Sequence, residues 1–340
     1  MNDINRSMVI DRVVRRVGEE DLGLLGLVFK KITTQKTKKI ATDIDESIPK
    51  IAPIMSDKEE GVVLEESATE THILDAAFTR LERTVDLDKV MVRQPGQKIG
   101  ENYDNTKVCK KNILRDLKTS IRTRQKLMAA NALFFGRIEA LDEDKDKASV
   151  KDINFNRHAD LSEVIQAADD KWSNLDANIP KQITQWAAKV RKVSGVSPNA
   201  LILDAEAGAY FEDNNVVEKK LNTRRGSESK LETACNTIGN LQHIGKLGTV
   251  DVIVYSERYE DAKGDSHPML PANSAILLDI DKVLGVLHYG SLKDKKQVVA
   301  KDFLVREIYN GKTGDEDISV ESRYLPIPHR INATFAATVA

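Results

Sequence analysis

The clearest pattern along the chain is a run of apolar residues at helical spacing between residues 107 and 141. Its apolar members recur three, four or seven positions apart: Leu114, Leu117, Ile121, Met128, Ala132 and Phe135. Capping residues precede the run at Asp104, Asn105 and Thr106. At about 1.5 Å of rise per residue, this segment predicts a helix roughly 50 Å long, which is long for a globular domain.

A second amphipathic helix is predicted over residues 179–194, since Asn178 and Pro180 mark its start and Gly195 its end. Shorter helices are predicted over 205–212 and 229–238. Apolar runs predict strands over 200–203, 250–255, 275–278, 283–288, 297–309, 317–325 and 331–339. The turn sequence Asn310-Gly-Lys-Thr-Gly314 predicts that the two long strands beside it form a hairpin.

The N-terminal third has a different character. Residues 5–30 predict a helix followed by a further helix or an extended arm, which either packs onto its own domain or lies on a neighbouring copy. Residues 31–100 are rich in Thr, Lys, Asp and Glu, and six acidic residues and one lysine lie between Asp57 and Glu70. We expect a long excursion with short strands that buries little by itself, and such a loop is uncommon unless it has a function.

Composition narrows the class of protein. The 340 residues are 41% apolar and 31% charged, and 51 basic against 53 acidic residues give a net charge of −2, so no global basic field drives nucleic-acid binding. The two cysteines, Cys109 and Cys235, lack the spacing of a disulfide framework or a zinc site. We expect inert thiols in a reducing compartment, no secretory signal, no membrane segment and no cofactor.

The motifs that would indicate an enzyme fail in detail. A phosphate-binding loop around Gly311 requires glycine where Arg306 stands. Asp142, Asp144 and Asp146 resemble the start of a calcium loop, but Lys147 and Ile153 occupy the positions of its glycine and its glutamate. The histidines are scattered, and neither HExxH nor GxSxG occurs. The chain is therefore not expected to be an enzyme, and a hydrolase with a dispersed site remains an alternative.

One local charge bias stands out within residues 107–126. Its basic residues are Lys107, Lys110, Lys111, Arg115, Lys118, Arg122, Arg124 and Lys126, and its single acidic residue is Asp116. This pattern fits either a solvated helix face or contact with an acidic surface such as nucleic acid. The candidate contact face comprises Lys111, Arg115, Lys118 and Arg122. Any such contact with nucleic acid would be nonspecific and salt-sensitive.

A second basic feature is the Arg224-Arg225-Gly226 turn between predicted helices. Arginine suits bidentate contacts with carboxylates or phosphates. The turn could form a local ion pair with Glu218, Glu228 or Glu232, or it could contact another subunit.

The sequence around this turn resembles the lambda-like major capsid protein E family of tailed bacteriophages. The matching residues are Lys220, Leu221, Thr223, Arg224, Arg225, Gly226, Ser227, Ser229, Leu231, Glu232, Thr233 and Ala234. Later landmarks are Val254-Tyr-Ser256, Tyr259, Leu270-Pro271, Asn273 and Tyr289-Gly290. The resemblance is specific over about 200–292. Elsewhere it lies in the order of the predicted elements, and in the first hundred residues the sequence match is poor.

This resemblance implies an α+β fold of the Hong Kong 97 type. By analogy, residues 1–48 would form the N-arm and 49–100 the E-loop region. Residues 101–175 and 293–325 would form the P-domain, with 107–141 as its spine helix. Residues 176–292 and 326–340 would form the A-domain.

The implied function is that of a major capsid protein, which self-assembles as hexamers and pentamers into an icosahedral shell around double-stranded DNA. The candidate intersubunit contacts are Arg224, Arg225, Glu232, Glu59 and Glu65, and the basic helix face would point inward. The implied partners are other copies, a separate scaffolding protein, a portal and a decoration protein, with assembly in the host cytoplasm and residence in the virion. An encapsulin-like protein nanocompartment and a nonspecific DNA-binding oligomer are the alternatives.

Overall fold

The computed structural model describes residues 22–44, 70–86, 106–139, 152–222, 237–238, 240–261, 263–294, 297–309 and 315–340. Several sequence predictions lie outside these residues: the helix before residue 22, the acidic excursion over 45–69, the helix over 229–236 and the turn at 310–314.

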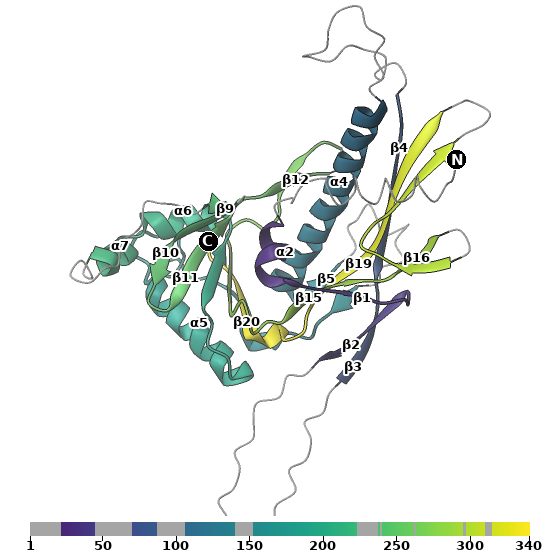
Figure 1. Cartoon of the computed structure of the whole chain (residues 1–340). Helices are drawn as coiled ribbons and strands as arrows, with labels where there is room; N and C mark the ends of the chain where they lie inside the picture. The colour runs from purple at the N-terminus through teal and green to yellow at the C-terminus, as the bar shows by residue number, and fades with distance from the viewer. Residues whose placement is uncertain are drawn as a thin grey trace, which may run out of the picture.

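The long helix is present as α4 (Thr106–Phe135) and crosses the molecule diagonally in Figure 1. Its 30 residues give a length of roughly 45 Å. The sequence predicts that it continues to residue 141, but α4 ends at Phe135. Gly136 has a positive φ of 67°, and Arg137–Ile138 then extend as β5, paired with β6 (Ile153–Asn154). A left-handed glycine is a common way to end a helix, which explains the early stop.

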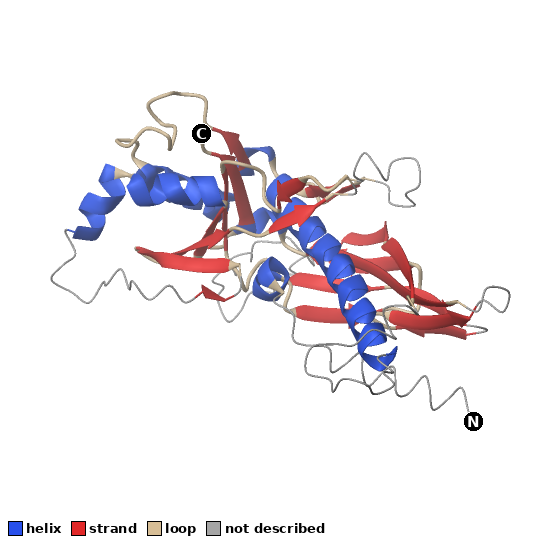
Figure 2. Cartoon of the chain, turned by 90° about the horizontal axis from the view of Figure 1, so that it is seen from above, coloured by secondary structure: helices blue, strands red, loops and turns tan. Residues whose placement is uncertain are grey.

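One sheet is organised around the 13-residue strand β19 (Glu316–Pro328). The first part of β19 pairs with β18 (Leu304–Tyr309) on one side and β4 (Ala77–Thr84) on the other. Its last part pairs with β15 (Gly285–Tyr289), which in turn pairs with β1 (Lys31–Thr34). The β18–β19 hairpin is confirmed, and α4 packs along β19 (Figure 2).

The single strand predicted over 297–309 is two strands. The first, β17 (Gln297–Ala300), pairs with β16 (Ser291–Asp294) in a separate ribbon, and β18 begins at Leu304. Between them Phe303 is buried beside α4. Turning this ring into the core requires a break in the strand that the local apolar pattern does not reveal.

A seven-stranded sheet forms the other half of the molecule. Its order is β7 (Ser162–Val164), β20 (Thr334–Thr338), β14 (Ser274–Leu278), β8 (Ala200–Leu203), β11 (Val250–Tyr255), β10 (Leu241–Leu247) and β9 (Thr237–Ile238). The predicted strands over 200–203, 250–255 and 275–278 are confirmed within a residue. Residues 237–238, predicted as the end of a helix, instead pair with β10 at the edge of the sheet.

Helices cover this second sheet. They are α5 (Ile179–Ser194), α6 (Ala205–Asp213) and α7 (Asn215–Asn222), seen at the left of Figure 1. The bounds of α5 agree with the prediction, because Asn178 caps its first turn and Gly195 ends it with a φ of 70°. Trp186 of α5 stacks between Trp172 and Phe335, with ring centroids 6.0 and 5.1 Å away. The remaining short elements are η2 (Ala159–Leu161), β12 (Arg258–Glu260), β13 (Ser266–Pro268) and η3 (Ile331–Ala333).

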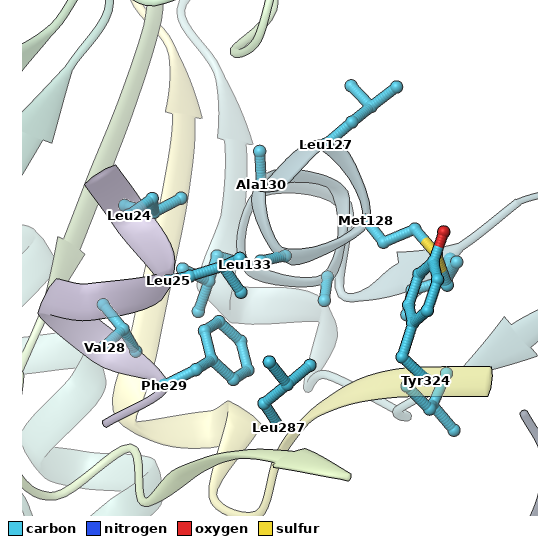
Figure 3. Packing of buried hydrophobic residues seen from close by; sticks show 14 of the residues in the cluster. Leu24, Leu25, Val28, Phe29, Leu127, Met128, Ala130, Leu133, Leu287 and Tyr324 are labelled. Carbon is cyan, nitrogen blue, oxygen red and sulfur yellow. The ribbon is translucent and has the colours of Figure 1, made fainter. Parts of the chain in front are cut away.

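The short helix α2 (Gly23–Val28) fills the angle between α4 and β15. Figure 3 shows Leu25 and Phe29 directed toward Leu133 and Leu287, in the same buried cluster. Of the two alternatives left open for residues 5–30, the part over 22–29 therefore packs onto its own chain. After β1, the chain forms the hairpin of β2 (Lys39–Ile44) and β3 (Glu70–Asp75) at the base of the molecule (Figure 1).

Both sheets join segments that are distant in sequence. β15, in the predicted A-domain range 176–292, pairs with β1 and with the last part of β19. β7 and Trp172, in the range 101–175, belong to the seven-stranded sheet and its core. The division into arm, loop and domains stays a prediction.

Candidate functional site

The four basic residues proposed for a contact face on α4 fall into two pairs. Lys118 is 8% exposed, and its ammonium lies 5.1 Å from the centre of the Phe303 ring. The guanidinium of Arg122 lies over the same ring at 4.9 Å and donates to the Tyr289 hydroxyl at 2.8 Å. Lys118 and Arg122 therefore make contacts within the chain, and cation–π packing explains how they lie beside the core.

The other two residues are exposed on the N-terminal half of α4. Lys111 and Arg115 are four residues apart, and exposed Lys107 precedes them by another four, so the three share one helix face. Arg115, with 59% of its side chain exposed, lies 3.9 Å from Asp116, which is paired more closely with Arg83 at 3.0 Å. We call Lys107, Lys111 and Arg115 the basic stripe.

A polar and nearly buried contact links α4 to the residues that follow β11 of the seven-stranded sheet. Lys126 of α4 forms an ion pair with Glu257 at 2.7 Å, and the Tyr255 hydroxyl donates to the other carboxylate oxygen at 2.6 Å. Removing one partner of such a pair would leave the other charge buried and unpaired, at a cost of about 3–5 kcal/mol. This contact fixes the helix against the end of β11.

A second buried carboxylate lies in the sheet around β19. Glu321 is 3% exposed and accepts from Arg80 of β4 at 2.8 Å and from Arg306 of β18 at 3.3 Å. The charge of Glu321 thus connects β19 to both neighbouring strands, β4 and β18. Neither Glu257 nor Glu321 stands in a local motif, so sequence patterns gave no means of finding them.

A pocket of about 330 Å³ contains His288 and His329. The Thr33 hydroxyl lies 2.7 Å from Nδ1 of His288. This is the arrangement of a hydroxyl group beside a base that could accept its proton. Burial, together with the charges of His329 and Lys31, lowers the pKa of His288 to about 4. A base this weak is poorly matched to activating a hydroxyl at neutral pH, and this weighs against the hydrolase alternative.

The remaining candidate residues, Arg224, Arg225, Glu232, Glu59 and Glu65, lie outside the described residues. In the described part of the chain, histidine, cysteine and acidic side chains nowhere gather in threes as a metal site. Among the same residues, every helix is too short or too polar to cross a membrane. The polar contacts described above mainly connect elements of the fold to one another.

The family model for phage major capsid protein E matches residues 9–339 of the chain. The chain belongs to this family. The match extends well beyond residues 200–292, where the sequence resemblance is specific, and includes most of the N-terminal third.

Members of the phage major capsid protein E family resemble this chain to different extents. The major capsid protein of Escherichia phage lambda is 28% identical over 193 residues, which cover 56% of this chain and 54% of that protein. The major capsid protein of Enterobacteria phage phi80 is 29% identical over 184 residues, which cover 53% of this chain and 51% of that protein. The chain spans about half the length of these two relatives. The major capsid protein of Enterobacteria phage P21 is 22% identical over 275 residues, which cover 79% of this chain and 78% of that protein.

Solved structures show the same fold. A crystal structure assigned to the capsid protein of an Escherichia coli CFT073 prophage superposes with a TM-score of 0.71 at 19% identity, covering 98% of this chain and 99% of that one. A phage-related protein from Bordetella bronchiseptica RB50 gives a TM-score of 0.54 at 12% identity, covering 98% and 96%. The α+β capsid fold implied by the sequence resemblance is thereby confirmed.

Proposed function

We propose that this chain is the major capsid subunit of a tailed bacteriophage, assembling as hexamers and pentamers into an icosahedral shell around double-stranded DNA. The observation that carries the proposal is the family match over residues 9–339, supported by the superposition over nearly the whole chain on a prophage capsid protein. In this proposal the subunits assemble in the host cytoplasm with a scaffolding protein and a portal, and a decoration protein binds the finished shell. The family is a structural one, so catalysis is not part of the proposal.

We propose that β1 and the β2–β3 hairpin at the base of the molecule pack against neighbouring subunits. On β1, Ile32 is 56% exposed, and on β3, Ile73 is 66% exposed. Large apolar side chains on extended strands are covered when a neighbouring copy packs against them, and assembly then stabilises the fold by mass action. The candidate contacts at Arg224, Arg225, Glu232, Glu59 and Glu65 would add charged pairs between copies.

Negative-stain electron microscopy of the purified full chain, with and without a candidate scaffolding partner, tests the proposal. We expect closed shells or rings of five and six subunits. A strictly monodisperse small species under both conditions would contradict it and would favour the DNA-binding alternative. Packaged protein in place of DNA inside shells formed in cells would instead favour the nanocompartment.

We propose further that the basic stripe contacts the packaged DNA. Replacing Lys107, Lys111 and Arg115 by glutamine is expected to weaken binding of the unassembled chain to double-stranded DNA, whatever the DNA sequence. The slope of log affinity against log salt concentration should fall by about three, since each phosphate contact contributes roughly 0.9. Fluorescence anisotropy across a salt series measures this slope.

The matched control replaces three exposed basic residues of α5, Lys181, Arg191 and Lys192, by glutamine. This control removes the same charge from the other half of the molecule. Equal losses in both variants would mean that only net charge matters, and the basic stripe would then lose its proposed role.

A further inference from the structure

The pocket that holds His288 and His329 brings together segments distant in sequence. His288 belongs to β15 and is 5% exposed, and half-buried His329 follows the last residue of β19. The two rings face each other, with their Nε2 atoms 3.5 Å apart. Leu284, which lines the pocket, is 53% exposed and has a positive φ of 51°, which is uncommon for a residue with a bulky side chain.

The contact between the two rings is poorly explained as a hydrogen bond. Nitrogen donors normally lie within about 3.2 Å of their acceptors, and 3.5 Å is at the outer limit. His288 has a better partner on its other nitrogen, because Nδ1 lies 2.7 Å from the Thr33 hydroxyl. When Nδ1–H donates to this oxygen, Nε2 presents a lone pair toward His329. A histidine that ligates a metal is commonly oriented in this way, by a hydrogen bond from its other ring nitrogen.

The spacing of the two nitrogens matches two ligands of a single ion. Two imidazole nitrogens at about 2.0–2.1 Å from a tetrahedral zinc ion are about 3.4 Å apart. We propose that His288 and His329 bind a divalent transition-metal ion of the zinc or copper class, with solvent completing its coordination. Imidazole suits these ions. The described residues offer no third histidine, cysteine or acidic ligand at the pair, so the affinity should be moderate.

The charges around the pocket also limit the affinity. Lys30 is paired with Asp281 at 3.1 Å, which largely offsets its charge. Lys31 acts electrostatically on His288 and would repel a cation. Removing the charge of Lys31 should therefore tighten metal binding, whereas a site elsewhere on the chain would not respond.

A bound ion would connect the N-terminal strands β1 and β2 to the β15–β19 pair. His288 contacts Thr33 of β1, and the Thr42 hydroxyl of β2 lies 3.4 Å from the ring of His329. An ion between the two rings would therefore hold both N-terminal strands against the β15–β19 pair. Because the ion binds only the folded arrangement, it would stabilise this junction by an amount that grows with the logarithm of the ion concentration above the dissociation constant.

The experiment is titration of the purified full chain with Cu²⁺, followed by electron paramagnetic resonance, and with Zn²⁺, followed by calorimetry. We expect a signal from copper with two nitrogen ligands. His329→Gln should weaken binding at least about tenfold and remove one nitrogen from the spectrum. Lys31→Gln should strengthen binding several-fold. His243→Gln, which removes a half-buried histidine beside Asp251, is the matched control and should leave both readouts unchanged.

Two results would overturn the proposal. One is a two-nitrogen spectrum that persists in His329→Gln, which would place the copper elsewhere. The other is binding of equal strength in the parent, His329→Gln and Lys31→Gln. If His288→Gln fails to fold, these two variants still decide the question, because His329 is half-buried and Lys31 is exposed.

Discussion

Replacing Phe29 by alanine is expected to lower the free energy of unfolding of the unassembled subunit by roughly 3–5 kcal/mol. Phe29 is 2% exposed and lies in the buried cluster that joins α2 to α4 and β15 (Figure 3). Removing the ring would leave a cavity between elements that are each held by other contacts and can collapse only partly. Urea unfolding followed by fluorescence and circular dichroism measures the change.

The packing of α2 against β15 can also be tested at Gly285 of β15. A Cβ at Gly285 would lie 2.7 Å from the backbone oxygen of Val28 and 3.0 Å from Cδ1 of Phe29. Gly285→Ala should therefore push α2 away from β15 and destabilise the subunit in the same direction. Hydrogen exchange should show lost protection in β1, which follows Phe29 and pairs with β15. These losses would link the packing of α2 to the order of β1.

Phe135→Ala is the matched control for this prediction. The Phe135 ring is 48% exposed at the end of α4 and contacts Phe134 edge to face, with centroids 5.0 Å apart. Its removal should cost about 1 kcal/mol, the value of one aromatic pair. If Phe29→Ala lost no more stability than Phe135→Ala, α2 would not be a structural part of the subunit core.

Elements whose signals are local could be predicted from the sequence. The bounds of α5 follow from a capping asparagine and a terminal glycine, and β8 and β11 follow from short, continuous apolar runs. The apolar pattern predicts too long a helix for α4 because Gly136 is followed by residues that also fit a helical pattern. The break at Phe303 and the sheet that β15 joins depend on partners far away in sequence, which periodicity does not encode.

The candidate contact face on α4 also depends on contacts that the sequence pattern does not reveal. Charge and helical spacing grouped Lys118 and Arg122 with Lys111 and Arg115 on one face of α4. The structure separates them because Phe303 and Tyr289, from other elements, lie against the first two. A basic side chain on a helix can thus be part of the packing, and its role depends on residues that no local pattern connects to it.

Arg225→Glu is expected to prevent shell formation while leaving the subunit folded. The last described residue before the turn, Asn222, ends α7, which lies at the end of the molecule away from α4 (Figure 1). Reversing a charge that pairs across an interface typically costs 2–5 kcal/mol in order of magnitude, roughly tenfold in affinity for each 1.4 kcal/mol. A ring of six subunits repeats the contact six times, so even tenfold per contact amounts to about a million-fold for the ring.

Electron microscopy and sedimentation measure assembly, and circular dichroism and urea unfolding show whether the subunit is intact. Arg191→Glu is the control, because it reverses an exposed arginine on α5 in the same half of the molecule. Shells should form in this control and be absent in Arg225→Glu. Adding Glu232→Arg to Arg225→Glu should restore assembly if these two residues meet across the interface, since the exchange re-creates the opposite pair.

Because the contact is repeated around a closed ring, partial effects are informative. A loss that raises the concentration required for assembly without abolishing shells would indicate an exposed pair worth less than about 1 kcal/mol. Rescue by exchange with Glu59 or Glu65, in place of Glu232, would identify the acidic excursion as the partner of the turn. Normal shells at normal concentration from Arg225→Glu would contradict the assignment and would move the search for the interface to the exposed apolar side chains of β1 and β3.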